Sequence, residues 1–256
     1  MSWNTFTGQM ARRLLVNWRV PIDVAASVLP QGRHRLRPTN VNGWAIAGLC
    51  LVRLEQLRPA GFPSLLGLSS ENLAIRVGVE WDSAHGMESG VLILRRETAS
   101  RVNKAIAPLA GFGMHHRCSF YVSETASGAD ITVRSTDGNY ARVHVTSAAC
   151  PTAGSAFRQV SQAQEFFRGG ECGYSPGSVA GSWSGATLRI HRWDVECMDV
   201  HFACSTAIDR LFHGQAAIDS AFIMRDIAHT WTVCPPRRFG VLRTGLVRSG
   251  QKMIAA

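Results

Sequence analysis

One segment of the chain constrains the fold more than any other, because its side chains alternate strictly between two kinds. Within residues 72–81, the apolar positions are Leu73, Ile75, Val77, Val79 and Trp81. The positions between them are Asn72, Ala74, Arg76, Gly78 and Glu80. Successive side chains of a β-strand point to opposite sides of a sheet, so this alternation predicts a strand with one face in a core.

The rest of the chain carries similar signals in short segments. Further strands are predicted at 12–20, 43–54, 90–94, 117–123, 129–135, 139–147, 186–193 and 195–204. Helical turns are predicted at 24–29, from 98 to about 109, and at 157–167, with a loop rich in Gly, Ser and Pro from 170 to 185. Many short strands with a few helices indicate an antiparallel, β-rich α+β fold curled into a barrel or sandwich. We interpret residues 1–256 as a single domain without internal repeats.

Composition excludes several classes of protein. Hydrophobic residues make up 46% of the chain and charged residues 18%, which excludes disorder. The longest run without a polar side chain, residues 44–52, is much shorter than the roughly 20 residues of a membrane-spanning helix. The formal charge is +9, but 25 of the 27 basic residues are scattered arginines. We therefore expect attraction to small anions, no nucleic-acid or membrane partner, and, without a signal-peptide pattern, a cytoplasmic location.

Motifs for metal, redox or cofactor chemistry are absent from the sequence. The seven cysteines are widely spaced and form no C-x-x-C pair, so we expect free thiols, no disulfide and no metal. Neither a G-x-G-x-x-G loop, a phosphate-binding P-loop nor an H-E-x-x-H helix occurs. The adjacent His115 and His116 would point to opposite faces of a strand and could not easily share a metal. We expect no cofactor.

Three predicted strands carry polar side chains along one face, which makes these side chains candidates for ligand binding. The three sets are Tyr140, Arg142, His144 and Thr146; Thr187, Arg189, His191 and Trp193; and Cys197, Asp199, His201 and Ala203. If these faces line a barrel, arginine and histidine would converge on an anion and could polarise a carbonyl group. The alternatives are an outer sheet face that meets water, which shows the same alternation, and a zinc site built from the three histidines.

Several segments in a fixed order resemble one protein family. They are LLVNWRVP at 14–21, SENL at 70–73, GVLILRRE at 90–97, EFF at 165–167 and GATLRIH at 185–191. Over about residues 11–232 the chain resembles the acetoacetate decarboxylase-like superfamily, in particular its branch of YqjF-type, DUF2071-like domains of unknown function. The resemblance implies antiparallel strands around a cone-shaped closed β-barrel with a few helices, its interior being the active site. Residues from about 240 to 256 would form a C-terminal tail.

The resemblance also implies catalytic residues. In the decarboxylases, a strand ending in Arg-Glu precedes a lysine pair, one member of which forms a Schiff base with the keto acid. Here Arg96 and Glu97 precede Asn103 and Lys104, so Lys104 is the candidate lysine, although Asn103 occupies the first position of the pair. Helix geometry opposes this role, because Lys104 points away from the apolar stripe that contains Ile106. We expect a surface lysine.

Two functions remain open. The first is an enzyme that acts on a small anionic carbonyl compound or keto acid, of lyase type, with Lys104, Arg96 and Glu97 as its catalytic candidates. The second is a non-catalytic ligand-binding or sensing module on the same barrel, and homo-oligomerisation is left open in both. The candidate substrate-binding residues are Arg19, Arg76, Arg142, His144, Arg189, His191 and His201.

Overall fold

Strands make up most of the described chain, which in this computed structural model comprises residues 4–32, 35–83, 86–149, 154–190 and 192–241. The strands are β1 (Thr5–Pro21), β2 (Arg37–Pro38), β3 (Trp44–Pro59), β4 (Leu68–Ser83), β5 (Gly86–Thr98), β6 (His116–Thr125), β7 (Gly128–Ser135), β8 (Tyr140–Ser147), β9 (Cys172–Pro176), β10 (Trp183–Ile190), β11 (Glu196–Ser205) and β12 (Ala217–Arg237). The helices are α1 (Ile22–Val28), the short 3-10 helix η1 (Ser64–Leu66), α2 (Arg101–Ile106), α3 (Val160–Gly169) and α4 (Thr206–Leu211). The predicted β-rich fold with few helices is confirmed.

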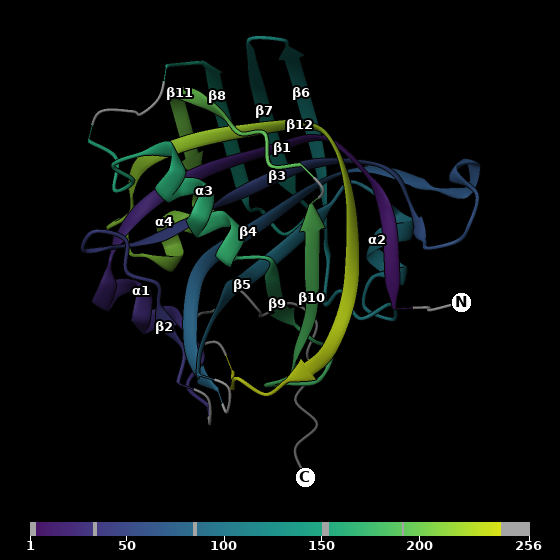
Figure 1. The fold of residues 1–256 in the computed structure, drawn as a ribbon, viewed down its shortest axis with the longest axis horizontal. Helices are drawn as coiled ribbons and strands as arrows, with labels where there is room; N and C mark the ends of the chain where they lie inside the picture. The colour runs from purple at the N-terminus through teal and green to yellow at the C-terminus, as the bar shows by residue number, and fades with distance from the viewer. Residues whose placement is uncertain (1–3, 33–34, 84–85, 150–153, 191, 242–256) are drawn as a thin grey trace.

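These strands belong to one sheet that pairs back on itself. Their order is β10-β9-β5-β6-β7-β8-β11-β12-β1-β3-β4-β2, and β10 also pairs with β12, and β5 with β4. Seven strands therefore pair in a circle, in the order β12-β1-β3-β4-β5-β9-β10 and back to β12, which we call the seven-strand ring. Strands β6, β7, β8 and β11 run side by side from β5 to β12 and form a second layer (Figure 1).

The main core lies between the ring and this second layer. In β4, the predicted apolar face is buried, with Ile75 and Val77 at 1% and 0% exposure. Both belong to one cluster with Ile131 of β7 and Val143 of β8. The opposite face of β4, which includes Arg76, points into the ring. The alternation of residues 72–81 is thus confirmed, and the second face meets a cavity.

Several elements of the structure were not predicted, among them β2, η1, β9, α4 and the long strand β12. Strand β9 lies within the segment expected to be a loop, where it pairs with β10 and, in parallel, with β5. Its Tyr174 packs so closely on Gly185 of β10 that a Cβ there would come within 2.6 Å of the ring. Helix α4 was not predicted; the Ser205 hydroxyl caps it by accepting a hydrogen bond from the Ile208 amide at 3.3 Å.

Cysteine spacing gave a wrong expectation about disulfides. Cys197 is disulfide-bonded. Among the residues that the structure describes, the free cysteines are Cys50, Cys118, Cys172, Cys204 and Cys234. Wide spacing in the sequence does not keep thiols apart in a sheet of this kind, because its strand pairs join segments that are distant along the chain. In the part of the chain that the structure describes, no three His, Cys, Asp or Glu side chains cluster in a way that could hold a metal.

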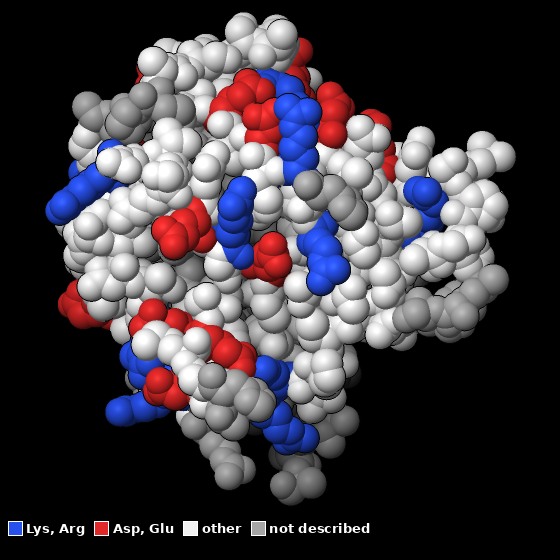
Figure 2. All heavy atoms as spheres, in the orientation of Figure 1, with Lys and Arg blue, Asp and Glu red and all other residues white. Residues whose placement is uncertain are grey.

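Basic and acidic side chains are interspersed on the face drawn in Figure 2, so this face carries no continuous basic area. Some arginines there and elsewhere form ion pairs, such as Arg37 with Asp82 at 2.8 Å and Arg142 with Asp130 at 2.9 Å. None of the described helices is long and apolar enough to cross a membrane.

Candidate functional site

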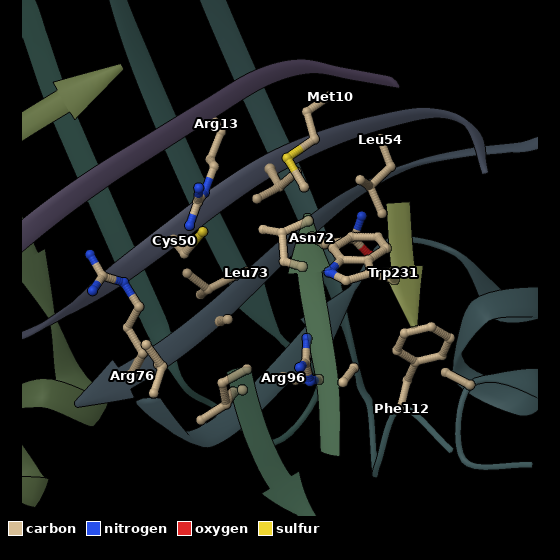
Figure 3. A pocket seen from close by; sticks show the side chains of 18 of the residues that line it. Met10, Arg13, Cys50, Leu54, Asn72, Leu73, Arg76, Arg96, Phe112 and Trp231 are labelled. Carbon is tan, nitrogen blue, oxygen red and sulfur yellow. The ribbon is translucent and has the colours of Figure 1, made fainter. Parts of the chain in front are cut away.

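A cavity of about 190 Å³ lies inside the seven-strand ring, and every strand of the ring contributes to its wall. Helices α2 and α3 and the segment after α2 complete the wall. Most lining side chains are apolar; the polar ones are Arg13, Cys50, Asn72, Arg76, Arg96, Glu97, Asn103, His115 and Glu171. Figure 3 shows Arg13, Arg76 and Arg96 entering this space from three different strands. The cavity is therefore apolar with a concentrated positive charge.

Arg76 projects from the polar face of β4 and is buried in the cavity wall. Its side chain is 4% exposed, its Nη2 donates to Asn17 Oδ1 at 2.7 Å, and its guanidinium lies 5.0 Å from the centre of the Phe167 ring. Its Nε is buried without a hydrogen-bond partner. Burial, together with the nearby charge of Arg13, lowers the pKa of Arg76 to about 10. The side chain therefore stays positively charged at neutral pH.

Arg96 reaches the cavity because β5 contains an extra residue. Ile75 pairs with Arg95 and Arg76 pairs with Ile93, so Leu94 has no partner in β4 and the alternation of β5 shifts there. Arg96, and not Arg95, consequently follows Ile93 into the cavity. Its Nε donates to Ser175 Oγ at 2.6 Å, and burial lowers the pKa of Arg96 to about 10.

Arg95 and Glu97, the two neighbours of Arg96 in the sequence, form an ion pair with each other. The Arg95 Nε donates to Glu97 Oε1 at 2.6 Å, and Arg95 Nη2 donates to Asp137 at 2.6 Å. Burial raises the pKa of Glu97, and the bond from Arg95 opposes this effect. Glu97 borders the cavity, but its charge is already compensated by Arg95.

Arg13 supplies a third guanidinium, from β1. It is 9% exposed, its guanidinium lies 5.6 Å from the Trp193 ring centre, and its Nη1 lies 3.9 Å from the Met224 sulfur. Arg13, Arg76 and Arg96 have no carboxylate oxygen within 4.0 Å among the described residues. Buried charges without a counter-charge are costly, which makes this part of the cavity a place where a bound anion would be stabilised.

His115 contributes a neutral imidazole beside Arg96. Its Nδ1 donates to the Gly113 carbonyl oxygen at 3.0 Å, because a carbonyl can only accept, and Nε2 is then left as an acceptor. Burial, and next the charge of Arg96, lower the pKa of His115 to about 3. The ring can therefore accept a hydrogen bond from a ligand at neutral pH, but it is a weak base.

The lysine implied by the resemblance does not reach this cavity. Asn103, Ile106, Ala107 and Ala110, at spacings of three and four, face the cavity, whereas Lys104 is exposed. The Asn103 amide donates to Ser70 Oγ at 2.8 Å. Of the two positions that match the lysine pair, the one that faces the cavity is thus Asn103, and no lysine among the described residues lines the cavity.

The catalytic candidates Arg96 and Glu97 and the binding candidate Arg76 line the same cavity, whereas the polar faces of the later strands do not. Arg142, Arg189 and His201 are exposed, and His144 is half-buried beside His201. None of these four lines the cavity, so the interpretation that these strand faces converge on a bound anion is wrong for them. His191 lies outside the described residues.

The reason is that β8 turns its apolar side, which includes Val143 and Val145, to the core. Arg142 and His144 consequently meet solvent, where both lie near Asp130, at 2.9 and 3.6 Å. The alternative of a solvated outer face describes this strand correctly.

Arg19 also lies elsewhere. Its Nη1 donates to the Gly154 carbonyl oxygen at 2.6 Å and lies 4.0 Å from Asp219, beside a separate pocket.

Comparison with known proteins supports the fold. A family model described as an uncharacterized conserved protein, DUF2071, matches residues 7–214. No curated protein matches the chain. An acetoacetate decarboxylase-like enzyme from Sphingomonas wittichii RW1 has a TM-score of 0.59 at 12% identity, covering 94% of this chain and 95% of that one.

Two further solved structures are similar at low identity. Acetoacetate decarboxylase from Legionella pneumophila has a TM-score of 0.59 at 9% identity, covering 90% of this chain and 87% of that one. The enduracididine biosynthesis enzyme MppR, complexed with pyruvate, has a TM-score of 0.57 at 15% identity, covering 92% and 90%. At such identities the likeness concerns the fold alone. The chain belongs to the DUF2071 family, and its fold is that of the acetoacetate decarboxylase-like enzymes.

Proposed function

We propose that this protein binds a small organic anion, a carboxylate, between Arg13, Arg76 and Arg96. The observation that carries the proposal is that three guanidiniums, those of Arg13 and Arg76 buried and that of Arg96 half-buried, face one cavity without a carboxylate within 4.0 Å in the described part of the chain. Guanidinium groups bind carboxylates through paired, charge-assisted hydrogen bonds. A bound carboxylate would supply the missing counter-charge, and the apolar wall would strengthen the attraction by excluding water.

The solved structures support this class of ligand. MppR, which shares the fold, has been solved with pyruvate bound. Pyruvate is a small carboxylate with a carbonyl group, the class that the three arginines suit. We also propose that the seven-strand ring is the wall of a cone-shaped closed barrel around this ligand; the pairing of β10 with β12 supports it.

A second candidate function is chemistry on the ligand's carbonyl group without a Schiff base. Glu97 favours it, since burial raises the pKa of this carboxylate, which borders the cavity paired with Arg95, and so makes it a stronger base that could accept a proton from the ligand. Arg96 is adjacent and would stabilise negative charge that develops on a carbonyl oxygen. The same cavity without turnover would be a ligand-binding or sensing module.

Thermal unfolding with pyruvate, acetoacetate and benzoate tests the binding. At a concentration 100 times Kd, a bound acid should raise Tm by about 5 °C in a protein of this size. We expect this rise in the wild type and in Arg189→Met, which removes an exposed arginine, and its loss in Arg96→Met. If none of the carboxylates raises Tm, the proposed function is wrong.

Proton NMR of the same mixtures separates the two versions of the function. Consumption of a keto acid by the wild type, but not by Glu97→Gln, would identify an enzyme. An unchanged ligand that still raises Tm would identify a binding module.

A further inference from the structure

The cavity changes from charged to apolar along its length, and the strand register fixes the order. Arg76, opposite Ile93, is the arginine nearest one end, and Val91, which pairs with Gly78, lines the cavity one row beyond it towards that end. Next come Cys50, Ala74 and Arg96, which pair across β3, β4 and β5. Arg13, Val52 and Asn72 pair across β1, β3 and β4 in the following row. All the cavity arginines thus lie in these three rows.

The rows beyond contain apolar side chains. Met10 pairs with Leu54 across β1 and β3, and Phe6 pairs with Trp231 across β1 and β12. Phe112 stands between the last two, with ring centroids 5.0 Å from Phe6 and 5.9 Å from Trp231 in edge-on contacts. In Figure 3, Phe112 and Trp231 lie on the side opposite Arg13 and Arg76, with Arg96 between them.

Most of the wall around these aromatic rings is apolar; the charged residue there is Glu171, whose carbonyl oxygen accepts a hydrogen bond from the amide of Leu188, the partner of Trp231. Leu57 of β3 and Ile106 and Ala110 from α2 and the following turn line the cavity there. Asn103 lies on the same side of α2, but its amide is already bonded to Ser70 Oγ. A polar ligand such as pyruvate would fill only the charged rows and leave the aromatic end empty or wetted.

We infer that the natural ligand is an amphiphilic monocarboxylate whose head group lies at Arg13, Arg76 and Arg96 and whose aryl or alkyl tail lies between Phe6, Phe112 and Trp231. This inference rests on the proposed function and narrows its ligand class. The charged rows would hold the carboxylate by paired hydrogen bonds. The tail would gain from burial of apolar surface and from edge-on contacts with the aromatic rings.

The inference can be tested with two ligand series, acetate to decanoate and phenylacetate to 4-phenylbutyrate, with pyruvate as the polar reference. Each methylene that enters the apolar end should tighten Kd about three- to fourfold until the cavity is full. The uncharged alcohol with the same tail, 4-phenylbutanol, should bind at least tenfold more weakly than the acid. Calorimetry gives each Kd.

Two variants distinguish binding of the carboxylate head group from binding of the apolar tail. Phe112→Ala should weaken 4-phenylbutyrate at least tenfold and leave acetate unchanged, whereas Arg96→Met should weaken both. Phe112→Leu, which keeps an apolar side chain, controls for loss of structure and should retain most of the affinity. If acetate and pyruvate bind as tightly as the tailed acids, the inference is wrong while the proposed function stands. If no acid in either series binds the wild type, the proposed function itself is wrong.

Discussion

Replacing Arg76 with methionine should stabilise the ligand-free protein while it weakens carboxylate binding. Burial lowers the pKa of Arg76 from 12.5 to about 10, so the folded state holds the charged form less favourably than the unfolded state does. At 1.36 kcal/mol per pH unit, the penalty is roughly 3 kcal/mol. Because the folded pKa is the lower one, the penalty is complete below about pH 10 and disappears only as the pH rises towards 12.5.

Methionine would keep the packing and remove the charge. It can lie against Phe167, whose ring centre is 5.0 Å from the guanidinium. The lost hydrogen bond from Arg76 to Asn17, at 2.7 Å, offsets about 2 kcal/mol of the gain. A net stabilisation of about 1 kcal/mol corresponds to a rise in Tm of about 2–4 °C.

Urea and thermal unfolding at pH 7, followed by circular dichroism, measure both effects. We expect a higher midpoint without ligand and a smaller shift on adding 4-phenylbutyrate or pyruvate. A variant that is destabilised by 2 kcal/mol, yet responds to the acids as the wild type does, would refute the reasoning. Arg76 would then be a structural residue whose charge is satisfied within the protein.

Two further predictions concern titratable groups near the cavity. Because Lys104 is exposed and lies outside the cavity, Lys104→Ala should leave ligand binding unchanged. For the same reason, borohydride added with a keto acid should trap no adduct on the wild type. An adduct at Lys104, detected by mass spectrometry of the digested protein, would show instead that this lysine forms a Schiff base. The pKa of His115 is lowered to about 3, so the wild type should lose stability as the pH falls from 6.5 towards 3, by about 2 kcal/mol at pH 5 from this group alone. His115→Gln should remove that part of the pH dependence in urea unfolding, and an unchanged slope would show that the imidazole titrates normally.

The sequence indicated which segments are strands far better than which faces meet the cavity. Alternation in 72–81 identified both sides of β4, since one side is wholly apolar and packs on the second layer. In β8 the same kind of alternation placed Arg142 at a site where it does not lie. A polar face can meet either water or a polar cavity, and the residues of one strand do not distinguish the two.

Arg13 was missed for a different reason. It follows Arg12 in a strand that is otherwise apolar, and adjacent residues point to opposite faces. Arg12 bonds Glu71 and Glu124, whereas Arg13 lines the cavity. The adjacent arginines were a usable signal, because one of two adjacent charges in a buried strand must face inward.

Arg95 and Arg96 are also adjacent arginines in a strand, and here the sequence alone predicts the wrong one of the two to face the cavity. Strict alternation from Val91 and Ile93 would send Arg95 into the cavity, but the unpaired Leu94 shifts the register and sends Arg96 there. Replacement by methionine should therefore reduce mainly stability at Arg95 and mainly carboxylate binding at Arg96. Arg95→Met leaves Glu97 buried without its partner and should cost about 3–5 kcal/mol of stability.

Arg96→Met loses one bond to Ser175 and a poorly solvated charge, so its stability should change by about 1 kcal/mol or less, while carboxylate binding falls at least tenfold. Urea unfolding and calorimetry on both variants measure the two effects on the same preparations. If the milder Arg95→Lys still binds carboxylates normally and Arg96→Met does not, the extra residue in β5 is what puts a guanidinium into the cavity. If Arg96→Met unfolds as easily as Arg95→Met and retains the acid, the shift of register does not determine the site.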